Sequence, residues 1–78
     1  MRAEELTQFW NAQPFVPFRL VLTDGRVFDV PHRDFIWIRR HLLTIAVPPD
    51  PARGTDEGWV FASPMHVVRV EMPSTQAA

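Results

Sequence analysis

The hydrophobic positions near the start of the chain follow a helical spacing. Leu6, Phe9 and Trp10 fall on one face of a helix, and two glutamates lie in the first turn, where the helix dipole favours acidic residues. Pro14 cannot continue a helix, so the pattern predicts a helix over residues 3–13. Because so short a helix is not stable alone in water, its aromatic face is expected to pack on the rest of the protein.

A period of two replaces the helical period from residue 18 onwards. Residues 18–30 alternate on both sides of an Asp-Gly pair, which predicts a β-hairpin. A two-residue turn would put Asp29 on the face of Leu20 and Leu22, whereas a three-residue loop with a left-handed Gly25 leaves one face almost wholly apolar. We therefore predict the three-residue loop. Its register pairs Leu22 with Arg26, Leu20 with Phe28, Phe18 with Val30, Val21 with Val27 and Arg19 with Asp29.

Residues 35–47 predict two further strands that turn near residues 39–41. The side chains expected on one face are Ile36, Ile38, Leu43, Ile45 and Val47. Those expected on the other face are Phe35, Trp37 and Thr44. Residues 48–58 are rich in proline, glycine and acidic residues, which predicts a mobile loop.

The C-terminal part predicts a strand in GWVFAS, a single helical turn in SPMH and a final strand over residues 67–72. In this last strand Val68, Val70 and Met72 are expected to face inward. Residues 73–78 are expected to be a disordered tail.

The order of these elements indicates a mainly β fold, interpreted as one helix followed by five antiparallel strands. Short twisted strands that each have one apolar face bury those faces together by closing into a small barrel or by forming a strongly bent sheet. We favour the barrel. The chain is then a single small domain over residues 1–72, with the helix at 3–13 and the barrel at 17–72.

The size of the chain predicts that it self-associates. A domain of 78 residues buries only about 60% of the surface that its unfolded chain exposes, and without cysteine neither disulfides nor thiolate metal sites can add stability. Oligomerisation is the remaining common device. The final strand, residues 67–72, has no Pro, Gly or Lys to block its edge, so we expect a homo-oligomer joined there. Alternatively, the N-terminal helix covers this edge and the protein is a monomer.

The charge balance limits the classes of partner. Eight basic residues, all arginine, and nine acidic residues give a net charge of −1, so the molecule as a whole has no field that would attract nucleic acid or membranes. The chain has no apolar run long enough to span a membrane. We expect a cytoplasmic protein without membrane contact.

The segment HRDFIWIRRH, residues 32–41, is the best candidate for a binding site. It combines cations, which contact phosphate, with aromatic rings, which stack on bases. Alternatively, the rings cover the helix and the arginines are a solvated hairpin tip. The candidate residues for contact with an anion or a nucleic acid are Arg33, Arg39, Arg40, Phe35 and Trp37.

His-Arg-Asp is also the order found in a protein-kinase catalytic loop, but the metal-binding Asn, the Gly-rich loop and the DFG motif are missing. PHRDF is therefore expected to be a structural corner, with Asp34 accepting backbone hydrogen bonds. His32, Asp34, His41 and His66 could supply metal ligands but lack a recognised ligand spacing, so we expect no metal site and no cofactor. Without cysteine, and with no serine in a nucleophile elbow, the protein is not expected to be an enzyme.

The string NAQPFVPFRLVLTDGRVFDVPHRDF resembles a family of short, uncharacterised bacterial proteins that share a PF-x-PFR-x-x-x-x-DGR-x-x-x-VPH-x-DF pattern. That family has no assigned activity, so the resemblance implies a common fold only. The order of elements, together with VFASPMHVVRVEMPS, also resembles the Sm and Hfq small barrels. This second resemblance implies rings formed by strand pairing between subunits and the binding of single-stranded RNA.

Two functions follow from these observations. The leading interpretation is a non-catalytic interaction module that self-associates and presents its loops to another macromolecule, such as a protein partner. The alternative is an Sm-like barrel that binds single-stranded nucleic acid.

Overall fold

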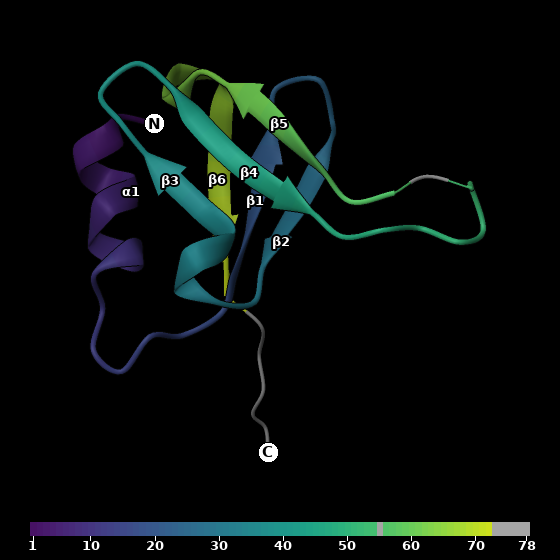
Figure 1. Cartoon of the computed structure of the whole chain (residues 1–78). Helices are drawn as coiled ribbons and strands as arrows, with labels where there is room; N and C mark the ends of the chain where they lie inside the picture. Colours follow the sequence, from purple (N-terminus) through teal and green to yellow (C-terminus); the bar gives the residue numbers. More distant parts are fainter. Residues whose placement is uncertain (55, 73–78) are drawn as a thin grey trace.

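One α-helix and six strands form the described part of the chain, which covers residues 1–54 and 56–72 of the computed structural model (Figure 1). The predicted tail at residues 73–78 lies outside the described residues. In chain order the elements are α1 (Ala3–Trp10), β1 (Phe18–Leu22), β2 (Val27–Val30), the 3₁₀ turn η1 (Arg33–Phe35), β3 (Ile36–Ile38), β4 (Leu43–Val47), β5 (Gly58–Ala62), the 3₁₀ turn η2 (Pro64–His66) and β6 (Val67–Glu71).

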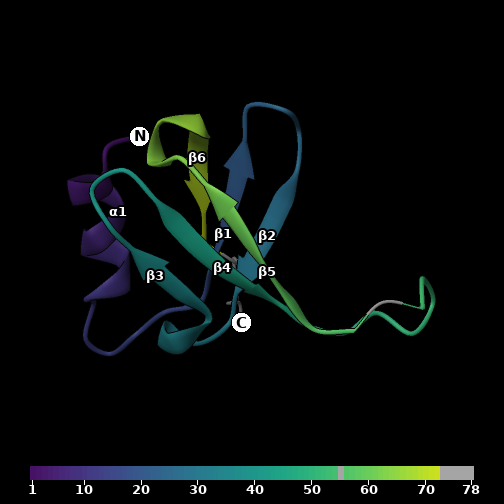
Figure 2. The same cartoon turned by 45° about the horizontal axis from the view of Figure 1, so that its top comes forward.

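The strands form two antiparallel sheets with the orders β2-β1-β6 and β3-β4-β5. In Figures 1 and 2 the second sheet crosses in front of the first, and α1 lies along one side. The inner faces of both sheets and α1 share one apolar core, in which the largest fully buried side chains include Leu6, Leu20, Ile36, Leu43 and Ile45. The mainly β class is therefore confirmed.

The prediction of five strands is wrong by one, because residues 18–30 and 35–47 each contribute two strands and the C-terminal part adds two more. Within the described residues no strand ladder joins the two sheets into a closed barrel. Pro31 and the η1 turn lie between β2 and β3, and a proline has no N–H to extend a ladder.

The β1–β2 hairpin has the predicted register. Phe18, Arg19, Leu20 and Val21 pair with Val30, Asp29, Phe28 and Val27. The loop closes through two backbone bonds, from the Leu22 N–H to the Arg26 carbonyl (2.9 Å) and from the Gly25 N–H to the Leu22 carbonyl (3.0 Å). Gly25 has φ +89°, the left-handed conformation that the bulge requires.

Asp24 fixes the same loop through its side chain. Its carboxylate accepts hydrogen bonds from the Arg26 N–H (3.0 Å) and from Arg26 Nε (2.7 Å). The backbone bond is the main reason that the pKa of Asp24 lies below its ordinary value. Because the pKa is lowered in the folded state, this contribution to stability is present above the ordinary pKa of Asp and is lost as the pH falls through the lowered pKa.

We expect Gly25→Val to destabilise the protein by about 1–3 kcal/mol. A Cβ at Gly25 would meet no atom within 4 Å, so the cost comes from the positive φ alone. Gly58→Val is the matched control, because Gly58 lies in β5 without a positive φ and its Cβ would also meet nothing within 4 Å. Urea denaturation should show a lower midpoint for the first variant only. Equal midpoints for the two variants would contradict the left-handed bulge.

The β3–β4 pair also matches the prediction. Ile36 pairs with Ile45, Trp37 with Thr44 and Ile38 with Leu43, so the expected apolar face is turned toward the core. Residues 48–54, which follow β4, extend away from both sheets in Figures 1 and 2.

The helix is shorter than predicted. It ends at Trp10, and the N–H of the C-cap residue Asn11 donates to the Thr7 carbonyl (2.9 Å). Helical geometry is disfavoured for Gln13, the residue before Pro14, so a helix that reaches residue 13 is unfavourable. α1 packs against β3 and η2, and it is too short to cross a membrane, as is every helix in the described part of the chain.

The prediction for β6 is wrong in its first half. Leu22 pairs with Val67 while Val21 pairs with Arg69, so the strand bulges and Val68 is the extra residue. Val67 therefore occupies the core position, and Val68 is 52% exposed. Val70 packs against the core as predicted, whereas Met72, just beyond the strand, is 45% exposed.

Candidate interaction surface

The five residues predicted to bind an anion or a nucleic acid do not form one site. Arg33 and Phe35 lie in η1, before β3, whereas Arg39 and Arg40 lie in the turn after β3. Trp37 is in the middle of β3, on its outer face. The structure therefore divides the segment into a corner, a sheet face and a hairpin tip.

Arg33 holds the end of α1. Its Nε donates to the Trp10 carbonyl (3.1 Å) and its Nη2 to Asn11 Oδ1 (3.0 Å), while the guanidinium carbon lies 4.6 Å from the centre of the Trp10 ring. In return, the Trp10 indole N–H donates to the Arg33 carbonyl (2.8 Å). The Arg33 guanidinium is therefore engaged in contacts within the fold, at the end of α1.

The PHRDF segment is a structural corner, as predicted, but the Asp34 carboxylate does not accept the backbone hydrogen bonds that were expected to order it. The turn is closed by the Phe35 N–H, which donates to the His32 carbonyl (3.1 Å). Among the described residues, Asp34 accepts no hydrogen bond and forms no ion pair. Phe35 is half-buried against the core, and its ring centre lies 5.7 Å from that of His32.

The outer face of the sheet β3-β4-β5 carries a cluster of exposed apolar side chains. Trp37 pairs across the sheet with Thr44, Thr44 pairs in turn with Phe61, and Ala46 pairs with Trp59, so these five side chains share one face. The indoles of Trp37 and Trp59 meet edge to face, with ring centres 6.0 Å apart.

Leu42 belongs to the same face, because it lies two residues before Thr44 and the Arg39 N–H donates to its carbonyl (2.9 Å). The cluster is called the outer surface below. It consists of Trp37, Leu42, Trp59 and Phe61, which are four of the nine large hydrophobic side chains exposed in the described chain. Their exposed fractions are 43%, 40%, 55% and 64%.

Trp59 and Phe61 were missing from the sequence-based site. The signal was present in the alternation of GWVFA, which puts both rings on the face opposite to the core-facing Val60 and Ala62.

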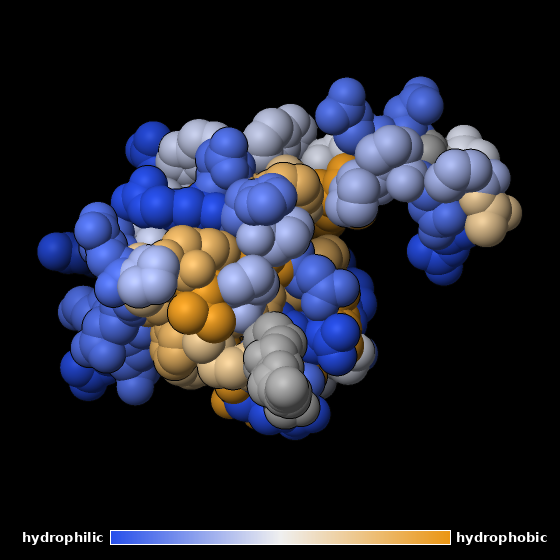
Figure 3. Space-filling view, turned by 90° about the horizontal axis from the view of Figure 1, so that it is seen from below, coloured by the Kyte–Doolittle hydropathy of each residue, from blue (hydrophilic) through white to orange (hydrophobic). Residues whose placement is uncertain are grey.

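Another apolar area is visible in Figure 3, which shows the molecule from below. The segment between α1 and β1 reaches this lower side in Figure 1. Phe15 of this segment packs on Phe18, with ring centres 5.8 Å apart, and so extends the core.

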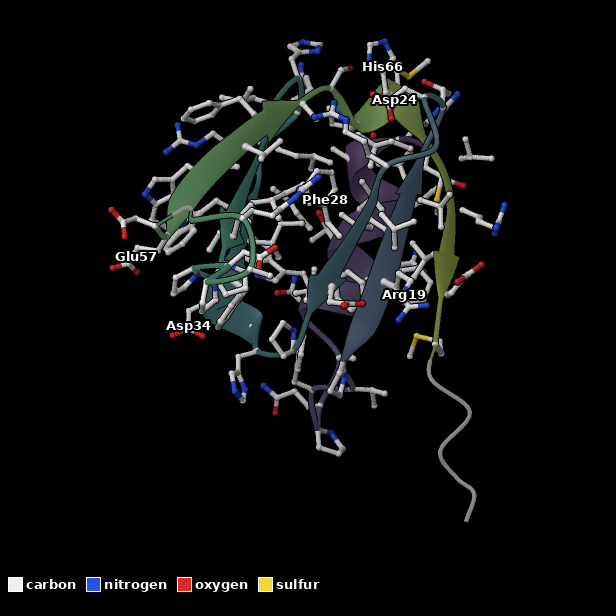
Figure 4. The ribbon with its side chains drawn as sticks, turned by 90° about the vertical axis from the view of Figure 1, so that its right-hand side faces the viewer. Arg19, Asp24, Phe28, Asp34, Glu57 and His66 are labelled. Atoms are coloured by element: carbon white, nitrogen blue, oxygen red, sulfur yellow. The ribbon has the colours of Figure 1, made fainter. Side chains whose placement is uncertain are left out.

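Charged side chains lie at the two ends of the outer surface. Arg39 and Arg40 are at the β3–β4 turn. At the opposite end, Asp34 and Glu57 line a cavity of about 330 Å³ whose walls also include Phe35 and Trp59. Figure 4 shows both carboxylates on the same side of the molecule, away from Arg19. Within residues 1–54 and 56–72 none of these four charged groups forms an ion pair.

The other sheet is different, because its charges neutralise one another. Across its outer face Asp29 contacts Arg19 (2.9 Å), Arg19 contacts Glu71 (3.9 Å) and Glu71 contacts Arg69 (2.8 Å). The hydrogen bond to Asp29 raises the pKa of Arg19 above its ordinary value. A cavity of about 530 Å³ on this side is lined by Arg19, Asp29 and Glu71, so its polar groups are already paired.

The four residues considered as metal ligands are spread over the fold. His32 precedes η1, Asp34 lies within it, His41 is in the β3–β4 turn and His66 ends η2. In the described part of the chain no three histidine, aspartate or glutamate side chains come together as a metal site would require.

Comparison of the chain with protein-family models, with curated proteins and with solved structures gives no match.

Proposed function

We propose that this protein is a non-catalytic interaction module that self-associates. The outer surface carries the proposal, because it gathers four exposed apolar side chains on one face of a small sheet. Contiguous apolar surface of this kind marks sites of macromolecular contact.

The state of the polar groups supports a non-catalytic role. In the 530 Å³ cavity, Arg19 is engaged by Asp29 and Glu71, which leaves its charge compensated. A catalytic site needs polar groups that converge on a substrate and are free to act on it. The chain also has no cysteine, the most readily activated nucleophile.

We expect the mass of the purified protein to depend on concentration. Light scattering over a hundredfold dilution should give a mass above 9.0 kDa at the concentrated end that falls toward 9.0 kDa on dilution. Such reversibility is typical of small interfaces. A mass of 9.0 kDa at every concentration would reject self-association.

An Sm-like barrel that binds single-stranded nucleic acid is the second candidate. Trp37 offers an exposed ring for stacking, and Arg39 and Arg40 lie beyond the end of the same strand. On this interpretation the two sheets are the halves of a small barrel and α1 covers its side. A salt titration of single-stranded RNA and DNA separates the candidates, since phosphate contacts weaken steeply with salt. Absence of binding at low salt would reject the second candidate.

A further inference from the structure

We infer that the outer surface binds a second copy of this chain about a two-fold axis, so that the acidic end of each copy faces the basic end of the other. This inference rests on the proposed function, because it names the partner and the arrangement of the same surface. The four charges that carry it are Arg39, Arg40, Asp34 and Glu57.

The charge arrangement follows from the sheet topology. β3 runs from Asp34 toward Arg39, and β5 begins directly after Glu57 and runs parallel to β3, since both are antiparallel to the central β4. Both carboxylates therefore lie at one end of the sheet and both guanidiniums lie at the other. Two positive and two negative charges are separated by the apolar rings of the outer surface.

This polarity is complementary to itself in one orientation only. If two copies met with their strands parallel, each carboxylate pair would face a carboxylate pair and each arginine pair an arginine pair, which is repulsive. A two-fold axis that lies between the two facing sheets, parallel to them and perpendicular to the strands, reverses the strand direction of one copy, so both ends meet opposite charges at once. Such an axis passes over the middle of β4 at Ile45, between the outward-facing Thr44 and Ala46.

The relief of the surface fits this arrangement. The central strand presents the small side chains Thr44 and Ala46, while the flanking strands present Trp37, Trp59 and Phe61. About this axis each strand faces the same strand of the other copy, so Trp59 and Phe61 of one copy lie over Phe61 and Trp59 of the other, where the aromatic side chains can pack on one another. The cavity beside Asp34 and Glu57 gives room for the arginine side chains of the second copy.

The alternative contacts are less favourable. The outer face of β2-β1-β6 has its charges already paired within the chain. At the edge of β6, the N-terminal ammonium of Met1 donates to the carbonyls of Val67 (2.8 Å) and Pro64 (3.1 Å), so α1 begins beside the strand that the sequence predicted as the interface.

The size of the surface makes the dimer weak and reversible. The three strands, which are three, five and five residues long and lie about 4.8 Å apart, give a footprint of roughly 200 Å² before the end loops are added. Stable interfaces bury about 800 Å² on each partner. Charge complementarity must therefore decide the orientation, and reversing the charges should have a large effect.

The test uses two charge-reversed variants of the full chain. In one, Arg39→Glu and Arg40→Glu make both ends acidic; in the other, Asp34→Arg and Glu57→Arg make both ends basic. Because all four side chains are exposed, we expect both variants to fold, which circular dichroism will check. Each variant alone should associate about a hundredfold more weakly than the unaltered protein, because both of its ends repel in the homodimer. An equimolar mixture should restore association to within about threefold, since both ends then attract.

The outcomes separate the inference from the proposed function. If the unaltered protein is a monomer at every concentration, the proposed function fails and the inference fails with it. If the unaltered protein associates but each variant does so equally well, or the mixture stays monomeric, self-association stands and the interface lies elsewhere. Should the arginine-bearing variant fail to fold, Asp34→Asn with Glu57→Gln takes its place. That neutral pair should weaken self-association about tenfold, and unchanged association would overturn the inference.

Discussion

Leu6→Ala is expected to remove a large part of the stability of the protein. Leu6 is fully buried and is the one residue of α1 that reaches the core completely. Removing a buried leucine side chain costs about 2–5 kcal/mol. A domain of 78 residues has a total stability of roughly 4–12 kcal/mol, so this loss is a large share of it.

The position of α1 adds to the effect. The helix packs against both β3 and η2, which belong to different parts of the fold, and eight residues are too few for a helix to persist without that packing. Gln8→Ala, on the exposed side of the same helix, is the control and should change stability by less than about 0.5 kcal/mol. Thermal denaturation followed by circular dichroism measures both. If the two variants melt together, α1 is not part of the cooperative core.

The strand registers could be predicted from the sequence because a wrong choice has an immediate cost. In the β1–β2 hairpin, a shift of one residue would have turned Asp29 toward the core, so only one loop length was acceptable. Alternation in β3 and β4 fixed their inner face in the same way. Where burial depends on strict alternation, the positions of the polar residues show which strand register is possible.

The differences from the prediction arise where alternation is interrupted. The bulge in β6 adds one residue opposite Leu22, so Val67 replaces Val68 in the core, and nothing in VVRV distinguishes these valines. Pro31 and η1 separate β2 from β3, a break that the apolar pattern on either side does not show. Counting apolar faces was therefore sufficient for the fold class but not for the closure of the sheets.

The candidate site was only partly predictable, because it depends on which segments meet. Arg33 belonged to the predicted group by composition, yet α1 folds back and takes its guanidinium. Trp37 was included, but its partner Trp59 is separated from it by the whole of β4 and the loop that follows. A surface made by three strands is visible in the sequence only after the strands have been paired.

Trp59→Thr combined with Phe61→Thr is expected to abolish self-association while the protein remains folded. These two side chains are the most exposed of the outer surface, at 55% and 64%, and their β5 neighbours Val60 and Ala62 keep the strand on the core. Threonine suits a strand, so the cost in stability should be limited to the cross-strand contacts, roughly 1–2 kcal/mol including the pair of indoles.

Association should respond much more strongly than stability. Aromatic side chains near the centre of an interface dominate its energy, and the loss of one commonly costs 2 kcal/mol or more, so about a hundredfold or greater weakening is expected for the pair. The control combines Val27→Thr with Met65→Thr, which removes two apolar side chains of similar exposure, 50% and 71%, that lie outside the outer surface. Light scattering at the concentration where the unaltered protein associates compares the three proteins. If the outer-surface variant keeps its mass while the control becomes monomeric, the contact lies on the β2-β1-β6 side of the molecule, because the outer surface would then have no part in holding the two copies together.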